Sequence, residues 1–326
     1  MNQPLVSIIG TFYNSGSYVT SAMESLLNQT YKNIEFICIN DGSNDDTLER
    51  LEKFAKNDPR IKLFSKKNEN SPHNAIAFGQ ERVSGDYVMS FDHDDLLSCD
   101  AVEEAVKSMT NNPNWDISLF KVFVKDKNGE KELKKRPTKI LSGKDAVISC
   151  LKGFEYSMRP FYKTKIYKTE NYQFIQAWQN YDEYIGIKIL GNSKNIGLNE
   201  GKYYYQDNPN SITSQVKFRH IETLEVHLIL MKDYLIKKNI YDEIKDWYEF
   251  IIFKRLNSMI YYYNKKVLKQ IILDDYQKTY ARDLFERCFN KLNKKVLINN
   301  SKGLEKVYLK LILSNFFIYS LVRKFK

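Results

Sequence analysis

Residues 87–95 read Tyr-Val-Met-Ser-Phe-Asp-His-Asp-Asp, an apolar run followed at once by three carboxylates. The aromatic and β-branched content of residues 87–91 predicts a buried strand, which would project the acidic residues from one edge of a sheet. Such close carboxylates repel one another unless a divalent cation or open water offsets their charge. Two interpretations stay open: a clamp for a metal and a diphosphate, or an acidic turn in which Asp95 or Asp100 caps the next helix.

Strand and helix signals alternate through the first hundred residues. Strands are expected at 6–9, 34–39, 61–64 and 87–91. Helices are expected to begin after Ser17, after Ser43 or Asn44, and at Ala75. This order predicts an α/β fold with a mostly parallel sheet and helices on both faces. Ligands bind at the carboxyl ends of such strands, so residues 11–13, 40–43 and 92–95 form one candidate rim.

Composition places the chain among globular proteins. Of its 326 residues, 43% are hydrophobic, so a packed core is expected, and the length suits about two domains. The four cysteines lie far apart without CxxC spacing, which disfavours a disulfide scaffold and a cysteine-rich zinc site. Neither a signal peptide nor an apolar run long enough to cross a membrane is visible. A cytoplasmic location is therefore expected.

The net charge of +10 is concentrated in one region. Residues 1–210 hold 27 Lys and Arg against 28 Asp and Glu, whereas residues 211–326 hold 23 against 12. Apolar helical patterns run through this basic region, most densely at 307–326. The combination predicts helices that bind an anionic surface, with the inner face of a bacterial cell membrane favoured. Packing on the catalytic domain or in a homodimer is the alternative, and no nucleic-acid motif accompanies the charge.

Several motifs occur in a fixed order along the chain. They are Phe12-Tyr13-Asn14, Glu24 to Tyr31, Asn40-Asp41-Gly42-Ser43, Gly85-Asp86-Tyr87 and Asp92-His93-Asp94-Asp95. Together they resemble the family-two glycosyltransferases, of the bacterial surface-polysaccharide type, which have a GT-A fold. The resemblance implies a nucleotide-sugar-binding half at 1–112 and an acceptor-side half at 113–214. It does not cover the helical region at 215–326.

The resemblance also implies an activity and a set of site residues. The activity is inverting transfer of a sugar from a nucleotide sugar, with UDP favoured, to a hydroxyl of a glycan or lipid-linked glycan such as capsule or lipopolysaccharide. The donor is expected against Thr11, Phe12, Tyr13, Asp41, Ser43, Asp92 and Asp94. A Mn²⁺ or Mg²⁺ ion is expected on Asp94 and Asp95, with Asp95 as its direct ligand.

Two segments depart from the family pattern. Residues 75–79 lack the Arg and Asn that many members carry there, so Lys66, Lys67 or His73 is expected to supply a cation near the donor, with Lys66 preferred. Gln206 follows Tyr205 where many members have Arg. The contacts to the diphosphate are therefore the least family-like part of the expected site.

A general base is implied by the family's later acidic pair, which aligns with Tyr181-Asp182. Asp182 would remove the proton of the acceptor hydroxyl as that oxygen attacks the anomeric carbon. Because the first acidic position is occupied by Tyr181, Glu183 is kept as the substitute.

Two other functions remain compatible with the sequence. A strand followed by Asp-x-Asp also opens haloacid-dehalogenase-type phosphatases and phosphotransferases, but these place it on the first strand and want Thr or Val where Leu96 stands. A non-catalytic nucleotide-binding scaffold that docks on membranes would fit the altered positions Tyr181 and Gln206.

Overall fold

The structure is a computed structural model that describes residues 3–69, 72–126, 129–132, 140–153, 160–170, 181–206, 208 and 218–314. The chain divides into two units. The first comprises residues 1–177 and 185–209, and the second comprises residues 178–184 and 210–326. The two expected halves, 1–112 and 113–214, fall in the first unit apart from residues 178–184 and 210–214, and the expected helical region at 215–326 falls in the second.

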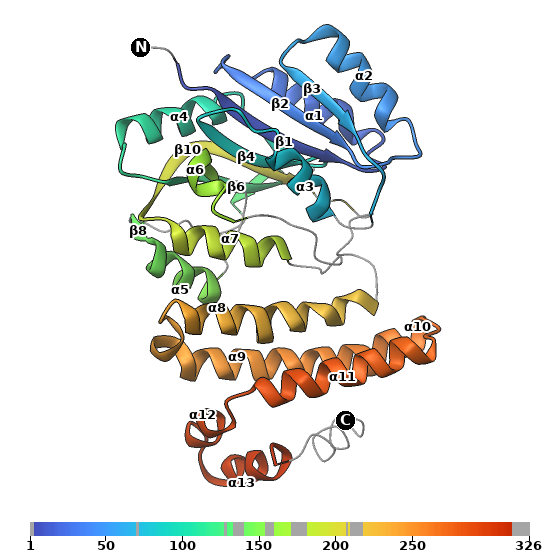
Figure 1. The fold of residues 1–326 in the computed structure, drawn as a ribbon, viewed down its shortest axis with the longest axis vertical. Coiled ribbons are helices and arrows are strands. Elements are labelled where there is room, and N and C mark those ends of the chain that lie inside the picture. The colour runs from blue at the N-terminus through green and yellow to red at the C-terminus, as the bar shows by residue number, and fades with distance from the viewer. Residues whose placement is uncertain are drawn as a thin grey trace. The chain divides into compact units, whose positions relative to one another are not determined.

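The first unit is built on a ten-stranded sheet with the order β3-β2-β1-β4-β9-β6-β10-β5, in which β7 also pairs with β6 and β8 with β10 (Figure 1). The long pairings are parallel and the antiparallel ones are short. The strands are β1 Val6–Phe12, β2 Ile34–Asn40, β3 Ile61–Ser65, β4 Tyr87–Asp92, β5 Leu96–Leu97, β6 Ile117–Asp126, β7 Gly129–Glu132, β8 Leu141–Ser142, β9 Phe161–Lys163 and β10 Asn195–Gln206. The expected α/β class and mostly parallel sheet are confirmed.

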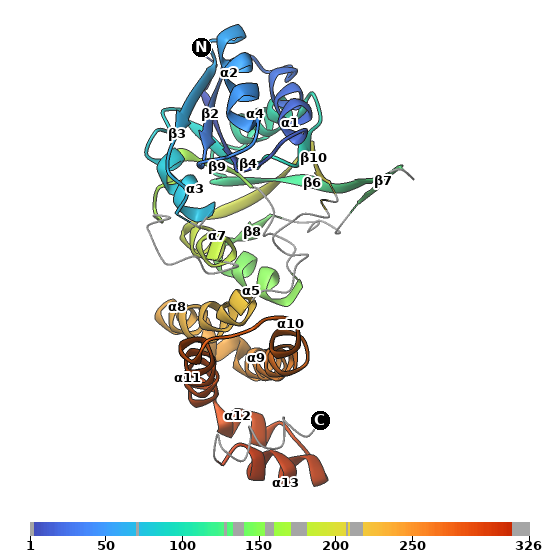
Figure 2. The same ribbon diagram turned by 90° about the vertical axis from the view of Figure 1, so that its right-hand side faces the viewer.

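Helices cover both faces of this sheet (Figure 2). The helices of the first unit are α1 Tyr18–Leu27, α2 Thr47–Asn57, α3 Pro72–Gln80, α4 Ala101–Asn111, α5 Gly143–Gly153 and α6 Thr164–Tyr167, together with most of α7 Tyr181–Asn192. α1 and α4 pack on the face that carries Ile8, whereas Gly79 of α3 lies against Ile9 on the opposite face. The alternation of side chains along β1 explains why both faces must be covered.

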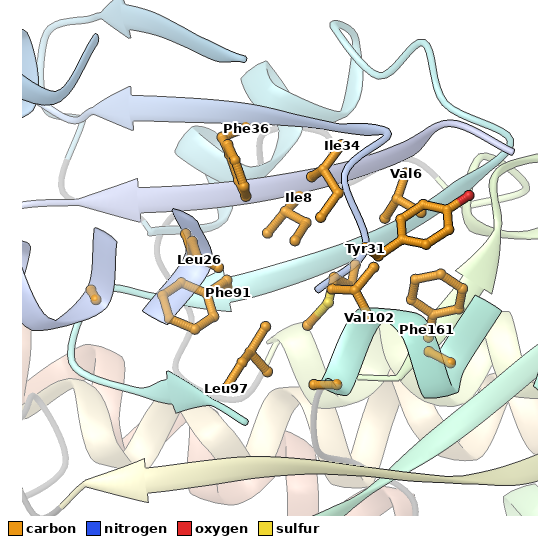
Figure 3. Packing of buried hydrophobic residues seen from close by; sticks show 14 of the residues in the cluster. Val6, Ile8, Leu26, Tyr31, Ile34, Phe36, Phe91, Leu97, Val102 and Phe161 are labelled. Carbon is orange, nitrogen blue, oxygen red and sulfur yellow. The ribbon is translucent and has the colours of Figure 1, made fainter. Parts of the chain in front are cut away.

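The main core lies between the sheet and the α1–α4 layer (Figure 3). All seven residues of β2 are buried, as a central parallel strand requires. From α1, the buried residues Val19, Ala22, Met23 and Leu26 recur at helical spacing and meet the strand side chains. The apolar periodicity of the first hundred residues is therefore the signal that fixes this core.

The start of α2 differs from the expectation. Its N-cap residue is Asp46, so the assignment of Ser43 or Asn44 as the cap was wrong. Both residues instead bond to the loop after β1: the Ser43 hydroxyl accepts from the Asn14 N–H, and the Asn44 N–H donates to the Asn14 side chain. The Ser43 hydroxyl, which could have accepted a capping hydrogen bond from the helix, therefore accepts one from the loop after β1 instead.

A buried carboxylate ties the amino-terminal ends of the first strands together. Glu35, at the start of β2, is 4% exposed and accepts hydrogen bonds from the Ser7 hydroxyl, the Ser84 N–H and the Lys62 ammonium. Burial opposes ionisation, but these donors outweigh it and lower the pKa of Glu35 to about 2. The Gly85 N–H in turn donates to Ser7, so the Gly-Asp-Tyr motif serves strand pairing at this edge.

The second unit is helical. Its described elements are the 3₁₀ helix η1 Phe218–Glu222, the π-helices η2 Glu225–Leu230 and η3 Tyr263–Val267, and the helices α8 Met231–Lys237, α9 Tyr241–Tyr262, α10 Leu268–Gln270, α11 Asp275–Lys291, α12 Lys294–Asn299 and α13 Gly303–Ile312. Among the residues described here, no helix is long and apolar enough to cross a bilayer. Residues 315–326, which include most of the apolar run expected at 307–326, lie outside the described residues.

One buried carboxylate organises this unit as well. Glu249 of α9 is fully buried and accepts from the Lys232 ammonium of α8 and from the Tyr241 hydroxyl at 2.6 Å. Its other oxygen accepts from the N–H of Asn293, at the start of α12, at 2.7 Å. A buried charge is tolerated only when partners satisfy it, so these bonds fix the packing of three helices.

Glu35→Gln tests whether the buried Glu35 carboxylate and its hydrogen-bond donors stabilise the first strands. The folded pKa of about 2 lies below the ordinary value of 4.5, so the carboxylate contributes on the order of 3 kcal/mol to stability above pH 4.5. This contribution is lost as the pH falls from about 4.5 toward 2. The variant should therefore be less stable than the wild type in urea unfolding at pH 7 and approach it at pH 3. The control Glu49→Gln removes an exposed carboxylate whose partner Lys53 is equally exposed, so it should lower the free energy of unfolding by less than about 1 kcal/mol. Equal losses of stability in the two variants would contradict the stabilising role of Glu35.

Candidate functional site

The strand order creates a switch point between β1 and β4. From β1 the chain moves to β2 and β3 on one side, then returns to pair β4 with the other side of β1. Thr11 lies beside Asp92 in this parallel ladder, while Phe12 lies beside Asn40 of β2. Crevices at such switch points are where open parallel sheets bind ligands. The ends of β3, β2, β1 and β4 thus place Lys66, Asp41, Tyr13 and Asp94 along one edge.

Side chains cross-link the loops that follow β1 and β2. The N–H of Ser15 donates to the Thr47 hydroxyl at 2.8 Å, and the N–H of Gly16 donates to the Asp45 carboxylate at 3.1 Å. Ser43, an expected donor-binding residue, accepts from the N–H of Asn14 at 3.1 Å. Asn14 itself has a φ of 47°, a left-handed conformation that a non-glycine residue rarely adopts. The two loops therefore form one pre-shaped wall of the candidate site.

Asp41 follows β2 and is held from two sides. The Lys66 ammonium lies 3.1 Å from one carboxylate oxygen, and the Asn68 side-chain amide lies 3.1 Å from the other. Burial raises the pKa of Asp41, and the nearby lysine opposes that shift. Lys66, the cation preferred from the sequence, therefore lies next to Asp41. Asn68 was missed in the sequence, because no local pattern marks a residue that reaches Asp41 across the strand end.

Gly42 makes the turn after Asp41 possible. Its φ is 71°, and a Cβ at this position would lie 2.7 Å from the backbone nitrogen of Asn68. Any side chain would meet both a strained backbone and a backbone clash. The glycine of the Asn-Asp-Gly-Ser motif is thus required for the close approach of Asn68 to Asp41.

Asp95 is turned into the protein. Its side chain is 1% exposed, accepts from the Tyr203 hydroxyl at 2.6 Å and accepts from the N–H of Gln206 at 3.2 Å. Burial raises its pKa to about 7, the neighbouring Asp94 adds to the shift, and the two hydrogen bonds oppose it. Asp95, the expected direct metal ligand, accepts one hydrogen bond from β10 at each of its oxygens. These bonds fix the acidic turn and leave a second lone pair on each oxygen.

Asp94 is half-buried at the same turn. Its carboxylate accepts from the Asn208 side chain at 2.9 Å, and its carbonyl oxygen accepts from the Gln206 side chain at 2.8 Å. Gln206, which replaces the Arg of many family members, therefore supports the acidic motif through hydrogen bonds. Tyr203, Gln206 and Asn208 were not predicted as site residues, since they lie more than 100 residues from the turn they support.

The aromatic residues after β1 have separate roles. Tyr13 is 46% exposed, so its ring is available to a ligand. Phe12 is fully buried in the core, and its ring centroid lies 6.5 Å from that of His93. The Tyr18 ring also contacts His93, edge-on and at the same centroid distance. Phe12 thus supports the acidic motif from inside, and we leave it out of the proposed donor contacts.

The metal chemistry can be tested on these groups. Within the described residues, no three His, Cys, Asp or Glu side chains are grouped so that they could hold a metal ion by themselves. Mg²⁺ and Mn²⁺ commonly bind one or two protein carboxylates and take their remaining ligands from substrate phosphates and water. Asp94, beside a buried carboxyl whose ionisation is disfavoured, fits that arrangement. A cation is expected here together with a diphosphate.

The expected base lies in a segment that belongs to the second unit. Asp182 is exposed in the first turn of α7. The neighbouring Glu183 has a carboxylate oxygen 3.6 Å from Nε2 of the buried His227. Asp182 is therefore more accessible to an acceptor than its substitute.

The sequence profile described as glycosyl transferase family 2 matches residues 7–197, more than half of the chain. The chain belongs to glycosyl transferase family 2. The match spans both the strand-end motifs and the start of α7. Membership in this family sets aside the interpretation as a haloacid-dehalogenase-type phosphatase, as does the position of Asp92 after the fourth strand.

Curated relatives match a little over a third of the chain. An uncharacterised glycosyltransferase of Haemophilus influenzae is 39% identical over 112 residues, which are 34% of this chain and 45% of that protein. The chondroitin synthase of Pasteurella multocida is 36% identical over 128 residues, which are 38% of this chain and 12% of that protein. The chain thus spans less than half the length of these relatives.

Solved structures share the fold. The crystal structure of S. aureus TarS 1–349 in complex with UDP-GlcNAc has a TM-score of 0.73 at 17% identity and covers 98% of this chain and 88% of its own. A mannosyltransferase of Pyrobaculum calidifontis in complex with GDP-Man and Mn²⁺ has a TM-score of 0.52 at 12% identity, with 92% and 89% covered. At these identities the likeness concerns the GT-A fold alone.

Tyr203→Phe tests the support that β10 gives to the family-2 acidic motif. Removing the hydroxyl leaves a buried Asp95 oxygen without its donor, so the free energy of unfolding should fall by about 1–3 kcal/mol. The control Tyr276→Phe removes a hydroxyl from a residue that is 77% exposed, so it should change the free energy of unfolding by less than about 0.5 kcal/mol. Chemical denaturation measures the free energy of unfolding of both variants. A value for Tyr203→Phe equal to that of the wild type would contradict the proposed support of Asp95 by Tyr203.

Proposed function

We propose that this protein is an inverting, metal-dependent glycosyltransferase that transfers a sugar from a UDP-sugar to a hydroxyl of a glycan or lipid-linked glycan. The observation that carries the proposal is the single edge on which β1, β2, β3 and β4 present Tyr13, Asp41, Lys66 and Asp94. An aromatic ring, a braced carboxylate, an ammonium and a second carboxylate match the base, ribose and diphosphate of such a donor.

Each group has a proposed task. Thr11 and Tyr13 line the nucleotide base, and Asp41 accepts a hydrogen bond from it. Lys66, already 3.1 Å from Asp41, places positive charge near the donor in place of the family's arginine. Ser43 keeps the loops in register, while Asp92 and Asp94 face the ribose and the diphosphate. The fixed loops lower the entropy cost of ordering a site on binding.

The reaction requires that negative charge on the leaving diphosphate be neutralised and that a base remove the proton of the acceptor hydroxyl. Mn²⁺ or Mg²⁺, when bound at Asp94 and Asp95, would offset charge on the departing diphosphate. The bonds of Asp95 to Tyr203 and Gln206 would also hold the turn that carries Asp94. Asp182 would take the proton of the acceptor hydroxyl during attack on the face opposite the leaving group, which inverts the anomeric centre.

The donor and acceptor classes are supported by relatives. TarS was crystallised with UDP-GlcNAc, which favours UDP over other nucleotides. Chondroitin and hyaluronan synthases among the relatives favour a polysaccharide product. We therefore propose a role in cell-surface polysaccharide synthesis, such as capsule or lipopolysaccharide, on the cytoplasmic side of the membrane.

Asp94→Asn tests the metal and diphosphate assignment. The variant should lose at least about tenfold in Mn²⁺-dependent affinity for UDP, because an amide is a weaker ligand and carries no charge. Isothermal titration with UDP, with and without Mn²⁺, measures the effect. Asp46→Asn, an exposed carboxylate paired with Arg50, is the matched control and should bind UDP normally. Unchanged Mn²⁺-dependent binding in Asp94→Asn would contradict the assignment.

Asp182→Asn tests the base. Transfer to acceptor should fall by about 10²–10⁴-fold while UDP binding persists, because only proton removal is lost. A panel of UDP-sugars is assayed for transfer and hydrolysis, with UDP affinity measured in parallel. Glu183→Gln is the comparison and should retain most activity. If Glu183→Gln abolishes turnover and Asp182→Asn does not, the base is Glu183 instead.

A further inference from the structure

The second unit contains a long amphipathic helix with an unusual exposed face. α9, η3 and α10 follow one another without a break from Tyr241 to Gln270 (Figure 1). One face is buried, with members at Ile252, Leu256, Ile260, Tyr263 and Val267. The other face is exposed and includes Phe250, Lys254, Tyr261, Lys265, Leu268 and Ile272, which we call the exposed stripe.

The stripe follows helical spacing. From Phe250 to Leu268 its members are separated by three, four or seven residues, which is the spacing of one side of a helix. Ile272 is exposed and follows the extended residue Ile271 beyond the helix end. The segment from Phe250 to Ile272 would extend roughly 30 Å. Its large apolar side chains are open to solvent: Ile272 is 101% exposed, Tyr261 57%, Leu268 45% and Phe250 44%. Such a linear apolar surface is atypical of a helix that faces only water.

The charge of this segment has one sign. Residues 250–273 contain Lys254, Arg255, Lys265, Lys266 and Lys269 and not one Asp or Glu. Glu249, the nearest preceding carboxylate, is buried and paired with Lys232. The Lys254 ammonium lies 4.3 Å from the centre of the Phe250 ring, so a positive charge and an apolar side chain are neighbours on this face.

A surface that alternates apolar groups and lysines suits one class of partner. A second copy of the chain would bring lysines against lysines, which disfavours self-pairing through this face. An anionic bilayer accepts both features, because apolar groups enter the acyl boundary while lysines reach the headgroups. We propose that the exposed stripe binds an anionic phospholipid surface, with the α9–α10 helix lying parallel to it. The inference rests on the second unit and is independent of the proposed catalytic function.

Vesicle binding by the full chain tests the charge requirement. Cosedimentation is measured with phosphatidylcholine vesicles and with vesicles of two parts phosphatidylcholine to one part phosphatidylglycerol. The wild type should bind the anionic vesicles, weaken as salt is raised, and leave the neutral vesicles unbound. The triple variant Lys254→Gln/Lys265→Gln/Lys269→Gln should lose about a hundredfold in partition coefficient, at about a factor of five per lysine. The matched control Lys237→Gln/Lys295→Gln/Lys302→Gln changes charge equally at exposed positions off the stripe and should lose less than tenfold.

A second pair of variants tests the apolar requirement. Leu268→Ser/Ile272→Ser should lose at least tenfold in binding, whereas Ile236→Ser/Val307→Ser, two exposed residues on other helices, should bind like the wild type. Circular dichroism and urea unfolding confirm that each protein is folded. Equal losses in stripe and control variants, binding to neutral vesicles, or no vesicle binding by folded wild type would each overturn the proposal. So would a stripe-dependent change in oligomeric state seen by light scattering, which would assign the face to a protein partner.

Discussion

The site depends on the parallel pairing of β1 with two neighbours at once. Because β1 is hydrogen-bonded to β2 on one side and to β4 on the other, both neighbours must end at the same edge of the sheet. This places Thr11 next to Asp92 and Phe12 next to Asn40, before any loop contributes a contact. Everything proposed for the donor site follows from that register, since a slip by one residue would turn each strand-end side chain to the other face.

The two edges of the sheet deal with buried charge in different ways. At the amino-terminal edge, Glu35 is surrounded by donors that favour the carboxylate, so it stabilises the fold and has no spare capacity for a ligand. At the carboxyl-terminal edge, Asp95 is held by fewer donors beside a second carboxylate, and burial disfavours its charge. Under the proposed function, a cation bound beside Asp94 would offset the unfavourable ionisation of Asp95.

Much of the fold of residues 1–112 could be predicted from the sequence, whereas much of the fold of residues 113–214 could not. Strands β1 to β4 are short segments rich in apolar residues, and their order fixes the topology. β10, with twelve residues, was missed because it contains Asn199, Glu200 and Gly201 at an irregularity between Leu198 and Lys202. The same irregularity hides Tyr203. The site's supports are therefore long-range contacts that leave no local pattern, whereas the residues they support are a local motif.

The contacts between the acidic turn and β10 also bear on how the chain acquires its fold. The bonds from Gln206 to Asp95 and Asp94 join positions 111 and 112 residues apart in sequence. Contacts this remote carry a large loop-closure cost and form late relative to neighbouring strand pairs. During synthesis the amino-terminal half would emerge with Asp95 not yet bonded to β10, so the acidic turn would gain these supports only after β10 has left the ribosome. A fragment ending before β10 could retain the parallel strands and still lack a settled acidic turn.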